Sequence, residues 1–140
     1  MCCDGSKRAA PQLHAVASTW SSCVELPVQR IFLGIAADLG LMVYGGDATD
    51  AYAYSPAPND TYLLINAAYA DWYENKYKKK LDRRQVLPVK HALQGHPESG
   101  KQWMRMIDNI LIAKMGFQTT THDRCIYRRV LSDGSIQLML

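Results

Sequence analysis

The sequence predicts an α+β fold in which an antiparallel sheet carries helices packed on one face. Two observations support this class: amphipathic helical patterns alternate with short apolar runs, and residues 125–140 hold an Asp-Gly turn between two apolar segments. The chain has 140 residues, 48% of them apolar, which is enough to bury one core. We therefore expect a single domain over residues 1–140, with no linker, repeat or low-complexity tract inside it.

The first helix is expected from Val28 to Leu39. Pro27 lies where a first turn tolerates proline, and Gly40 lies where a helix would stop. The apolar residues at helical spacing are Val28, Ile31, Phe32, Ile35, Ala36 and Leu39. The run Leu41–Tyr44 then predicts a short buried strand, because Gly45 and Gly46 leave no room for another helix. Asp47 is therefore expected at a strand end.

The middle of the chain predicts one further strand and one further helix. Thr61–Ile65 is the strand, Asn66–Asp82 is a helix with a basic tail, and residues 85–93 are extended with Pro88 restricting them to a sheet edge.

A second strong helix follows, with Ser99 as its expected cap and Gly116 at its end. One face of this helix carries Trp103, Met106, Ile107, Ile110 and Leu111. The chain then closes as a hairpin, with Asp133-Gly134 as its two-residue turn.

Composition argues against several classes of protein. No apolar run reaches the roughly 20 residues that a membrane span needs, and the N-terminus carries charge where a signal peptide is apolar. The cysteines Cys2, Cys3, Cys23 and Cys125 lack the paired spacing of a zinc site or a disulfide framework. We expect an intracellular protein with reduced thiols.

The net charge of +3 is unevenly distributed. Residues 76–90 hold seven basic side chains against Asp82 alone, so this segment carries +6 and the remainder −3. Such a concentration predicts a polyanion as partner. A solvated helix end, where lysines favour the negative pole of the helix dipole, explains the same charges without a partner.

The segment GGDATDAYAYSP, residues 45–56, contains the most informative carboxylates. Asp47 at a strand end beside glycines is suited to a hard divalent cation such as Mg²⁺, which prefers oxygen ligands. A two-metal phosphoryl-transfer site needs further acidic oxygens. Asp50, three residues later, either faces a bound ligand or caps the following turn.

Four segments together resemble the reverse transcriptase of copia-type long-terminal-repeat retrotransposons. GDATDAYAYSP resembles the first catalytic motif, in which an aspartate precedes the aromatic residue that touches the sugar of the incoming nucleotide. Three other segments resemble further parts of this family in the same order. The helix before the first motif is matched by TWSSCVELPVQRIFLGIAADLGL, and two later segments are matched by VKHALQGHPESGKQW and GFQTTTHDRCIYRR. DATDAY alone recurs by chance in unrelated proteins, whereas four segments in the same order and the same strand and helix context are specific to the family. The resemblance covers the chain from about Lys7 onward.

The resemblance implies a role for each matching residue. Asp47 would be the catalytic metal ligand, for Mg²⁺ or Mn²⁺, while Asp50 and Ala51 would lie beside the triphosphate. Tyr52 would be the steric gate that excludes a ribose 2′-hydroxyl. Gln94 and Gly95 would form the floor of the nucleotide site. A catalytic role for His91 or His96 is not expected, because metals and positioning drive nucleotidyl transfer, and Trp103 is expected in the core.

The resemblance also implies the partners. They are an RNA template, a DNA primer, deoxynucleoside triphosphates and the rest of a retrotransposon polyprotein, in the cytoplasm or a virus-like particle. The basic residues expected to contact nucleic-acid phosphates are Lys76, Lys78, Lys79, Lys80, Arg83 and Arg84.

The family's valine-aspartate-aspartate turn, which supplies the other metal ligands, is expected just after SIQLML. We therefore expect a partial fingers and palm domain, truncated at both ends and inactive by itself as a polymerase. Two alternatives stay open: a non-catalytic palm-like module that binds nucleic acid, and a decayed transposon product.

Overall fold

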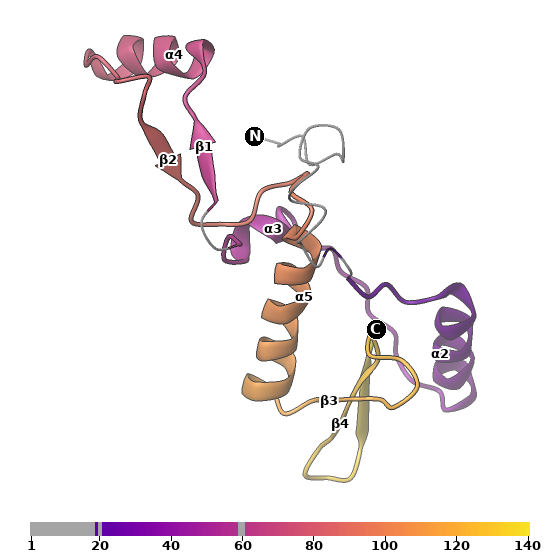
Figure 1. The fold of residues 1–140 in the computed structure, drawn as a ribbon. Helices are drawn as coiled ribbons and strands as arrows, with labels where there is room; N and C mark the ends of the chain where they lie inside the picture. Colours follow the sequence, from indigo (N-terminus) through magenta and orange to yellow (C-terminus); the bar gives the residue numbers. More distant parts are fainter. Residues whose placement is uncertain (1–18, 20, 59–60) are drawn as a thin grey trace.

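The structure is a computed structural model that describes residue 19, residues 21–58 and residues 61–140. Helices and small antiparallel sheets alternate along the chain, which confirms the α+β class (Figure 1). The strands form two separate sheets, β1-β2 and β3-β4-β5, where a single sheet was expected. Among the described residues, no helix is long and apolar enough to cross a membrane.

Helix α2 spans Leu26–Asp38, close to the predicted range. Pro27 lies in its first turn, and Gly40, at φ 61°, ends it in the left-handed conformation that glycine adopts most easily. Its apolar side chains form little core, because Ala36 alone is buried in this helix, while Ile31 and Leu39 are each 63% exposed.

The buried strand predicted at Leu41–Tyr44 is wrong. Residues 41–48 have no helix or strand assignment, and Met42 and Tyr44 are 76% and 80% exposed. The apolar pattern was present, but the described residues provide no neighbouring strand to accept its backbone hydrogen bonds. Asp47 therefore lies in an exposed irregular segment instead of at a strand end.

Strands β1 (Tyr62–Leu64) and β2 (Val86–Pro88) pair in antiparallel register, with Leu63 opposite Leu87. They form the stem of an arm, residues 61–89, whose tip is helix α4, Ala67–Tyr77 (Figure 1). Asn66 caps α4 by accepting a hydrogen bond from the Tyr69 amide at 2.8 Å. The helix ends five residues before Asp82, because Lys78 adopts a left-handed conformation at φ 55°.

Helix α5 spans Ser99–Asp108 and continues as a π-helical segment, η1, Asn109–Lys114. Ser99 is its first residue and not its cap, because the side chain donates a 2.6 Å hydrogen bond to the Leu93 carbonyl oxygen. Gly116 ends the segment at φ 74°, as predicted. Trp103 is only partly buried, so the prediction that it lies in the core is wrong.

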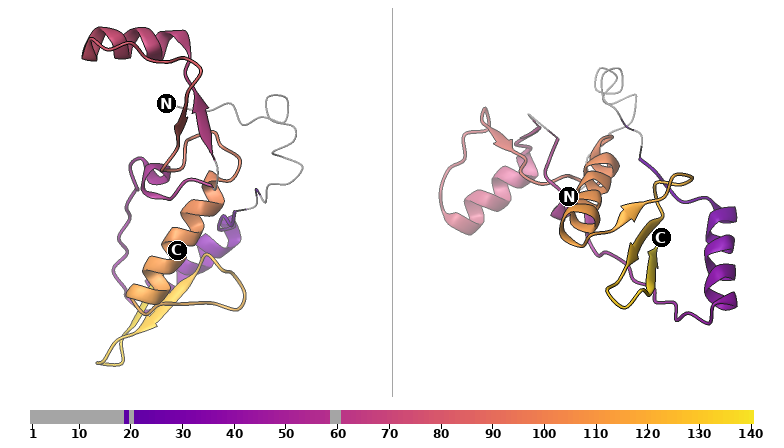
Figure 2. Two further views of the ribbon diagram at one scale, coloured as in Figure 1. Left: turned by 60° about the vertical axis from the view of Figure 1, so that its left-hand side comes forward. Right: turned by 90° about the horizontal axis from the view of Figure 1, so that it is seen from below.

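The three-stranded sheet comprises β3 (Gln118–Thr119), β4 (Tyr127–Val130) and β5 (Ile136–Met139). The predicted hairpin β4-β5 is confirmed, although its turn is longer than two residues: the Leu131 amide donates to Ser135, and the Gly134 amide donates to Leu131. Figure 2 shows α5 and α2 on opposite sides of this sheet, so the helices do not share one face. Leu111, Phe117 and Tyr127 form the core, with Ile107 packed against it.

Candidate nucleotide and nucleic-acid sites

The segment around Asp47 leads into a four-residue helix, α3, Ala51–Tyr54. Asp47 is exposed. Asp50 adopts a left-handed conformation at φ 53°, and its side chain makes no capping hydrogen bond, so the interpretation of Asp50 as a cap is wrong. Instead its carbonyl oxygen accepts a 2.8 Å hydrogen bond from the Ala53 amide. Asp50 is thus a turn residue whose carboxylate is solvent-exposed.

Tyr52 and the start of α5 lie side by side, since α3 packs against α5. A Cβ atom added to Gly100 would lie 3.9 Å from the Tyr52 hydroxyl and 3.0 Å from Ser21 Oγ. The close neighbour of position 100 is therefore Ser21, while the hydroxyl of the half-buried Tyr52 lies at ordinary van der Waals distance from a Cβ at this position. Sequence reasoning missed this contact, because a glycine in a first helical turn does not indicate a packing partner.

A short backbone ladder joins the end of α3 to the segment before α5. The Ala92 amide donates to the Ser55 carbonyl at 3.0 Å, and the Ala57 amide donates to the Lys90 carbonyl at the same distance. Pro56 and His91 form an isolated bridge between these two bonds. The ladder brings the Gln94–Gly95 turn within a few residues of α3, so these two predicted nucleotide-site segments are neighbours.

Gln94 and Gly95 are both exposed, and Gly95 has φ 87°, a conformation that requires glycine. His96 Nδ1 accepts a 3.2 Å hydrogen bond from the Glu98 amide, and burial lowers the pKa of this imidazole. His96 therefore accepts a backbone hydrogen bond within its own turn, which is a structural role. Ser55 is fully buried, and its Oγ has no hydrogen-bond partner within the described ranges. No pattern in the sequence marked Ser55 or Ser99 as buried polar groups.

The basic residues at 76–84 occupy the tip of the arm, and only some of them are engaged. Arg83 forms a 2.9 Å ion pair with Asp71, and Arg84 pairs with Asp82 at 3.2 Å. The pKa of Asp82 is lowered, first by the backbone amide of Arg84 and then by its guanidinium. In the part of the chain that the structure describes, no carboxylate oxygen lies within 4.0 Å of Lys78, Lys79 or Lys80. These three exposed lysines are available to an anionic partner.

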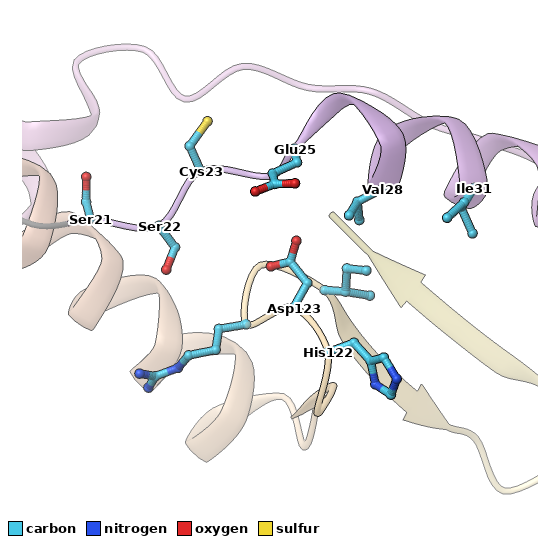
Figure 3. A pocket seen from close by; sticks show the side chains of 10 residues that line it. Ser21, Ser22, Cys23, Glu25, Val28, Ile31, His122 and Asp123 are labelled. Atoms are coloured by element: carbon cyan, nitrogen blue, oxygen red, sulfur yellow. The ribbon is translucent and has the colours of Figure 1, made fainter.

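A separate open pocket of about 800 Å³ lies between the start of α2 and the loop before β4 (Figure 3). Its walls include Cys23, Val28 and His122, with the carboxylates of Glu25 and Asp123 pointing into it. None of the predicted site residues lines this pocket. Cys23 and Cys125 are free thiols, and burial raises the pKa of Cys125. Cys2 and Cys3 lie outside the described residues.

Across residues 21–58 and 61–140, no group of three or more His, Cys, Asp or Glu side chains could hold a metal ion. Asp47 offers one exposed carboxylate to a cation, and its neighbour Asp50 offers a second from the adjoining turn. Comparisons with protein-family models, curated proteins and solved structures found no match. Assignment of a function therefore depends on the residues themselves.

Proposed function

We propose that this chain is a fingers and palm fragment of an RNA-directed DNA polymerase from a copia-type retrotransposon. Asp47 is assigned to the metal, with Asp50, Ala51 and Tyr52 beside the nucleotide and Gln94 and Gly95 beneath it. The observation that supports it most is the pairing of residues 55–57 with 90–92, which makes neighbours of two motif segments almost 40 residues apart. The packing of α3, which carries Tyr52, against α5 adds a second contact between the same two regions.

The carboxylate of Asp47 is the right type of ligand for a divalent cation, but a single carboxylate is too few. A carboxylate is a ligand that Mg²⁺ or Mn²⁺ prefers, yet a stable site with a bound triphosphate needs more than one. When bound, the ion would neutralise charge on the triphosphate. The chain's own contribution is binding: Asp47 would hold the ion, while Tyr52 and the Gln94–Gly95 turn would position the sugar and base. We expect no polymerase activity from these 140 residues alone.

The test is nucleotide binding measured by NMR with Mn²⁺ as a paramagnetic probe. With dCTP present, the ion should broaden the amide signals of Asp50, Ala51 and Tyr52, with a dissociation constant on the order of 1 mM, about −4 kcal/mol. Asp47→Asn should abolish the broadening, whereas Asp38→Asn, which removes an exposed carboxylate from α2, should not. Equal broadening in the Asp47→Asn variant would refute the assignment.

Two further measurements bear on the same proposal. CTP should bind more weakly than dCTP, and Tyr52→Ala should reduce that difference, because the ring would no longer occupy the space of a 2′-hydroxyl. In the DNA that follows the codon for Leu140, translation in all frames should give a valine-aspartate-aspartate turn close behind. A downstream sequence without that motif in any frame would count against the polymerase.

A second candidate is a non-catalytic module that binds nucleic acid, and the exposed lysines of the arm favour it. Binding that weakens with salt and does not depend on magnesium would support this module. Absence of any nucleotide effect on Asp47, together with retained RNA binding, would select it over the polymerase.

A further inference from the structure

Helix α4 carries an aromatic cluster at the tip of the arm. Tyr69 contacts Trp72 and Tyr73, with ring centroids 5.5 Å and 6.3 Å away, and Tyr77 lies 4.8 Å from Tyr73 and 6.1 Å from Trp72. The spacing of three and four residues places these rings on one side of the helix. The helix sequence, AAYADWYENKY, contains no Leu, Ile, Val or Met. Its apolar surface is thus made of aromatic rings and alanine.

These rings do not form the core of the protein. Trp72 and Tyr77 are 49% and 48% exposed, and Ala70 is the buried residue of α4. Figures 1 and 2 show α4 at the far end of the β1-β2 stem, away from α5 and the three-stranded sheet. Exposed aromatic surface of this kind is a common feature of binding sites.

Positive charge borders the cluster. Lys76 Nζ lies 4.9 Å from the centre of the Trp72 ring and 5.4 Å from that of Tyr77, within range of cation–π attraction. Lys78, Lys79 and Lys80 follow directly and are exposed. The arm between residues 67 and 85 holds six basic and three acidic side chains, a net charge of +3. Aromatic faces and free lysines therefore occupy the same tip.

We propose that the tip of the arm binds single-stranded nucleic acid, with an unpaired base stacked on Trp72 and the backbone phosphates held by Lys78, Lys79 and Lys80. An aromatic ring can stack on an unpaired base of any sequence, and nearby lysines follow the phosphates. In a duplex the base faces are already covered by their neighbours, so Trp72 would have nothing to stack on. The inference rests on the nucleic-acid partner of the proposed function, and it specifies a strand type and a stacking residue.

The composition of the tip also argues against a membrane surface as its partner. Helices that insert into the lipid interface bury aliphatic side chains such as leucine together with aromatic ones. Here aliphatic chains longer than alanine are absent from α4, and the exposed Asp71 and partly exposed Glu74 lie among the rings. Insertion of the ring face into the lipid interface would remove these carboxylates from water at a cost in free energy, whereas a stacked base covers a single ring and leaves them solvated.

Fluorescence anisotropy with labelled oligo(U) and oligo(dT) tests the proposal, with a mixed-sequence duplex of equal length and phosphatidylserine vesicles as competitors. Trp72→Ala should weaken single-strand binding by between about 5-fold and about 150-fold, the range of one stacked base. Trp72→Phe, which retains a stacking ring, should recover most of that loss. Tyr44→Ala removes an aromatic ring that is 80% exposed outside the arm and should change the affinity by less than about 2-fold.

The salt dependence separates the two parts of the interaction. Replacing Lys78, Lys79 and Lys80 together by alanine should reduce the slope of log affinity against log salt by about 2, since each single-strand phosphate contact contributes about 0.7. Lys114→Ala, an exposed lysine at the end of η1, serves as the charge control and should leave the slope nearly unchanged.

Several results would overturn the inference. They are unchanged binding by Trp72→Ala, equal or better competition by the duplex, and displacement of oligo(U) by the vesicles. The buffer contains neither magnesium nor nucleotide, so the outcome is independent of the Mn²⁺ measurement at Asp47. Failure of the polymerase proposal and failure of the stacking proposal are thereby distinguishable.

Discussion

Replacing Tyr127 with phenylalanine removes one hydroxyl group from the core while keeping the ring. Tyr127 is 7% exposed, packs with Leu111 and Phe117, and donates a 2.7 Å hydrogen bond to Asp108 Oδ1. A hydrogen bond to a charged group contributes about 1.5–3 kcal/mol to stability. Because Asp108 is partly exposed, water can replace the lost donor, and we expect the lower end of this range. The free energy of unfolding should fall by about 1.5 kcal/mol.

Urea denaturation followed by circular dichroism measures this change, and thermal denaturation should show a fall in Tm of about 6 °C. Tyr44→Phe is the matched control, because its ring is 80% exposed, and it should stay within about 0.5 kcal/mol of the wild type. A Tyr127→Phe variant as stable as the wild type would refute the reasoning, since the hydroxyl would then give no net stabilisation.

The pH dependence provides an independent check. Burial, and next the hydrogen bond to Asp108, raise the pKa of Tyr127 above its ordinary value of 10.0. The folded protein therefore retains this proton more strongly than the unfolded chain. The resulting stabilisation is fully present below pH 10 and is lost as the pH rises from 10 toward the raised pKa. The stability difference between wild type and Tyr127→Phe should narrow above pH 10.

Three further changes test the local structure. The Asp133 carboxylate accepts hydrogen bonds from the Ser135 hydroxyl and amide, which lower its pKa below 3.8. The resulting stabilisation is present above pH 3.8 and is lost as the pH falls through the lowered pKa. Asp133→Ala should therefore make amide exchange in β4-β5 faster at pH 7, and the stability of this hairpin should change less on acidification than in the wild type. Burial lowers the pKa of His96, so an NMR titration should give a pKa below 6.5 for this imidazole. The free energy of unfolding should then fall as the pH drops below 6.5. Ser99→Ala should cost about 1–2 kcal/mol in urea denaturation, because the partly buried Leu93 carbonyl loses its 2.6 Å partner; a loss below 0.5 kcal/mol would show that water replaces it.

Sequence patterns correctly predicted the elements that depend mainly on residues close to them in the chain. The helical spacing from Val28 to Leu39 located α2, and the Asp133-Gly134 signal located the β4-β5 hairpin. Leu41–Tyr44 had an equally clear apolar pattern and forms no strand, because a strand also needs a partner that the pattern does not specify. Helix α4 was predicted too long for a similar reason. Its end depends on Glu74, whose carbonyl and carboxylate oxygens accept hydrogen bonds from the amides of Lys78 and Leu81.

The candidate site was predictable as a set of residues but not as an arrangement. The segment 45–56 indicated Asp47, Asp50 and Tyr52, yet it predicted neither the left-handed conformation of Asp50 nor the packing of α3 against α5. The lysines of the arm were evident from charge alone. Their neighbours in space were not, because ion pairing of Arg83 and ring contacts of Lys76 require the folded positions of Asp71 and Trp72.

The division of the strands between two sheets has a consequence for how the molecule responds to heat. A two-stranded ladder of three residues a side is barely stable in water by itself, whereas the three-stranded sheet is anchored by Leu111, Phe117 and Tyr127. The amides of Tyr62–Leu64 should therefore exchange with deuterium well before those of Tyr127–Val130. Melting of this chain is then a sequence of events, in which the projecting arm opens and recloses many times while the three-stranded sheet stays folded.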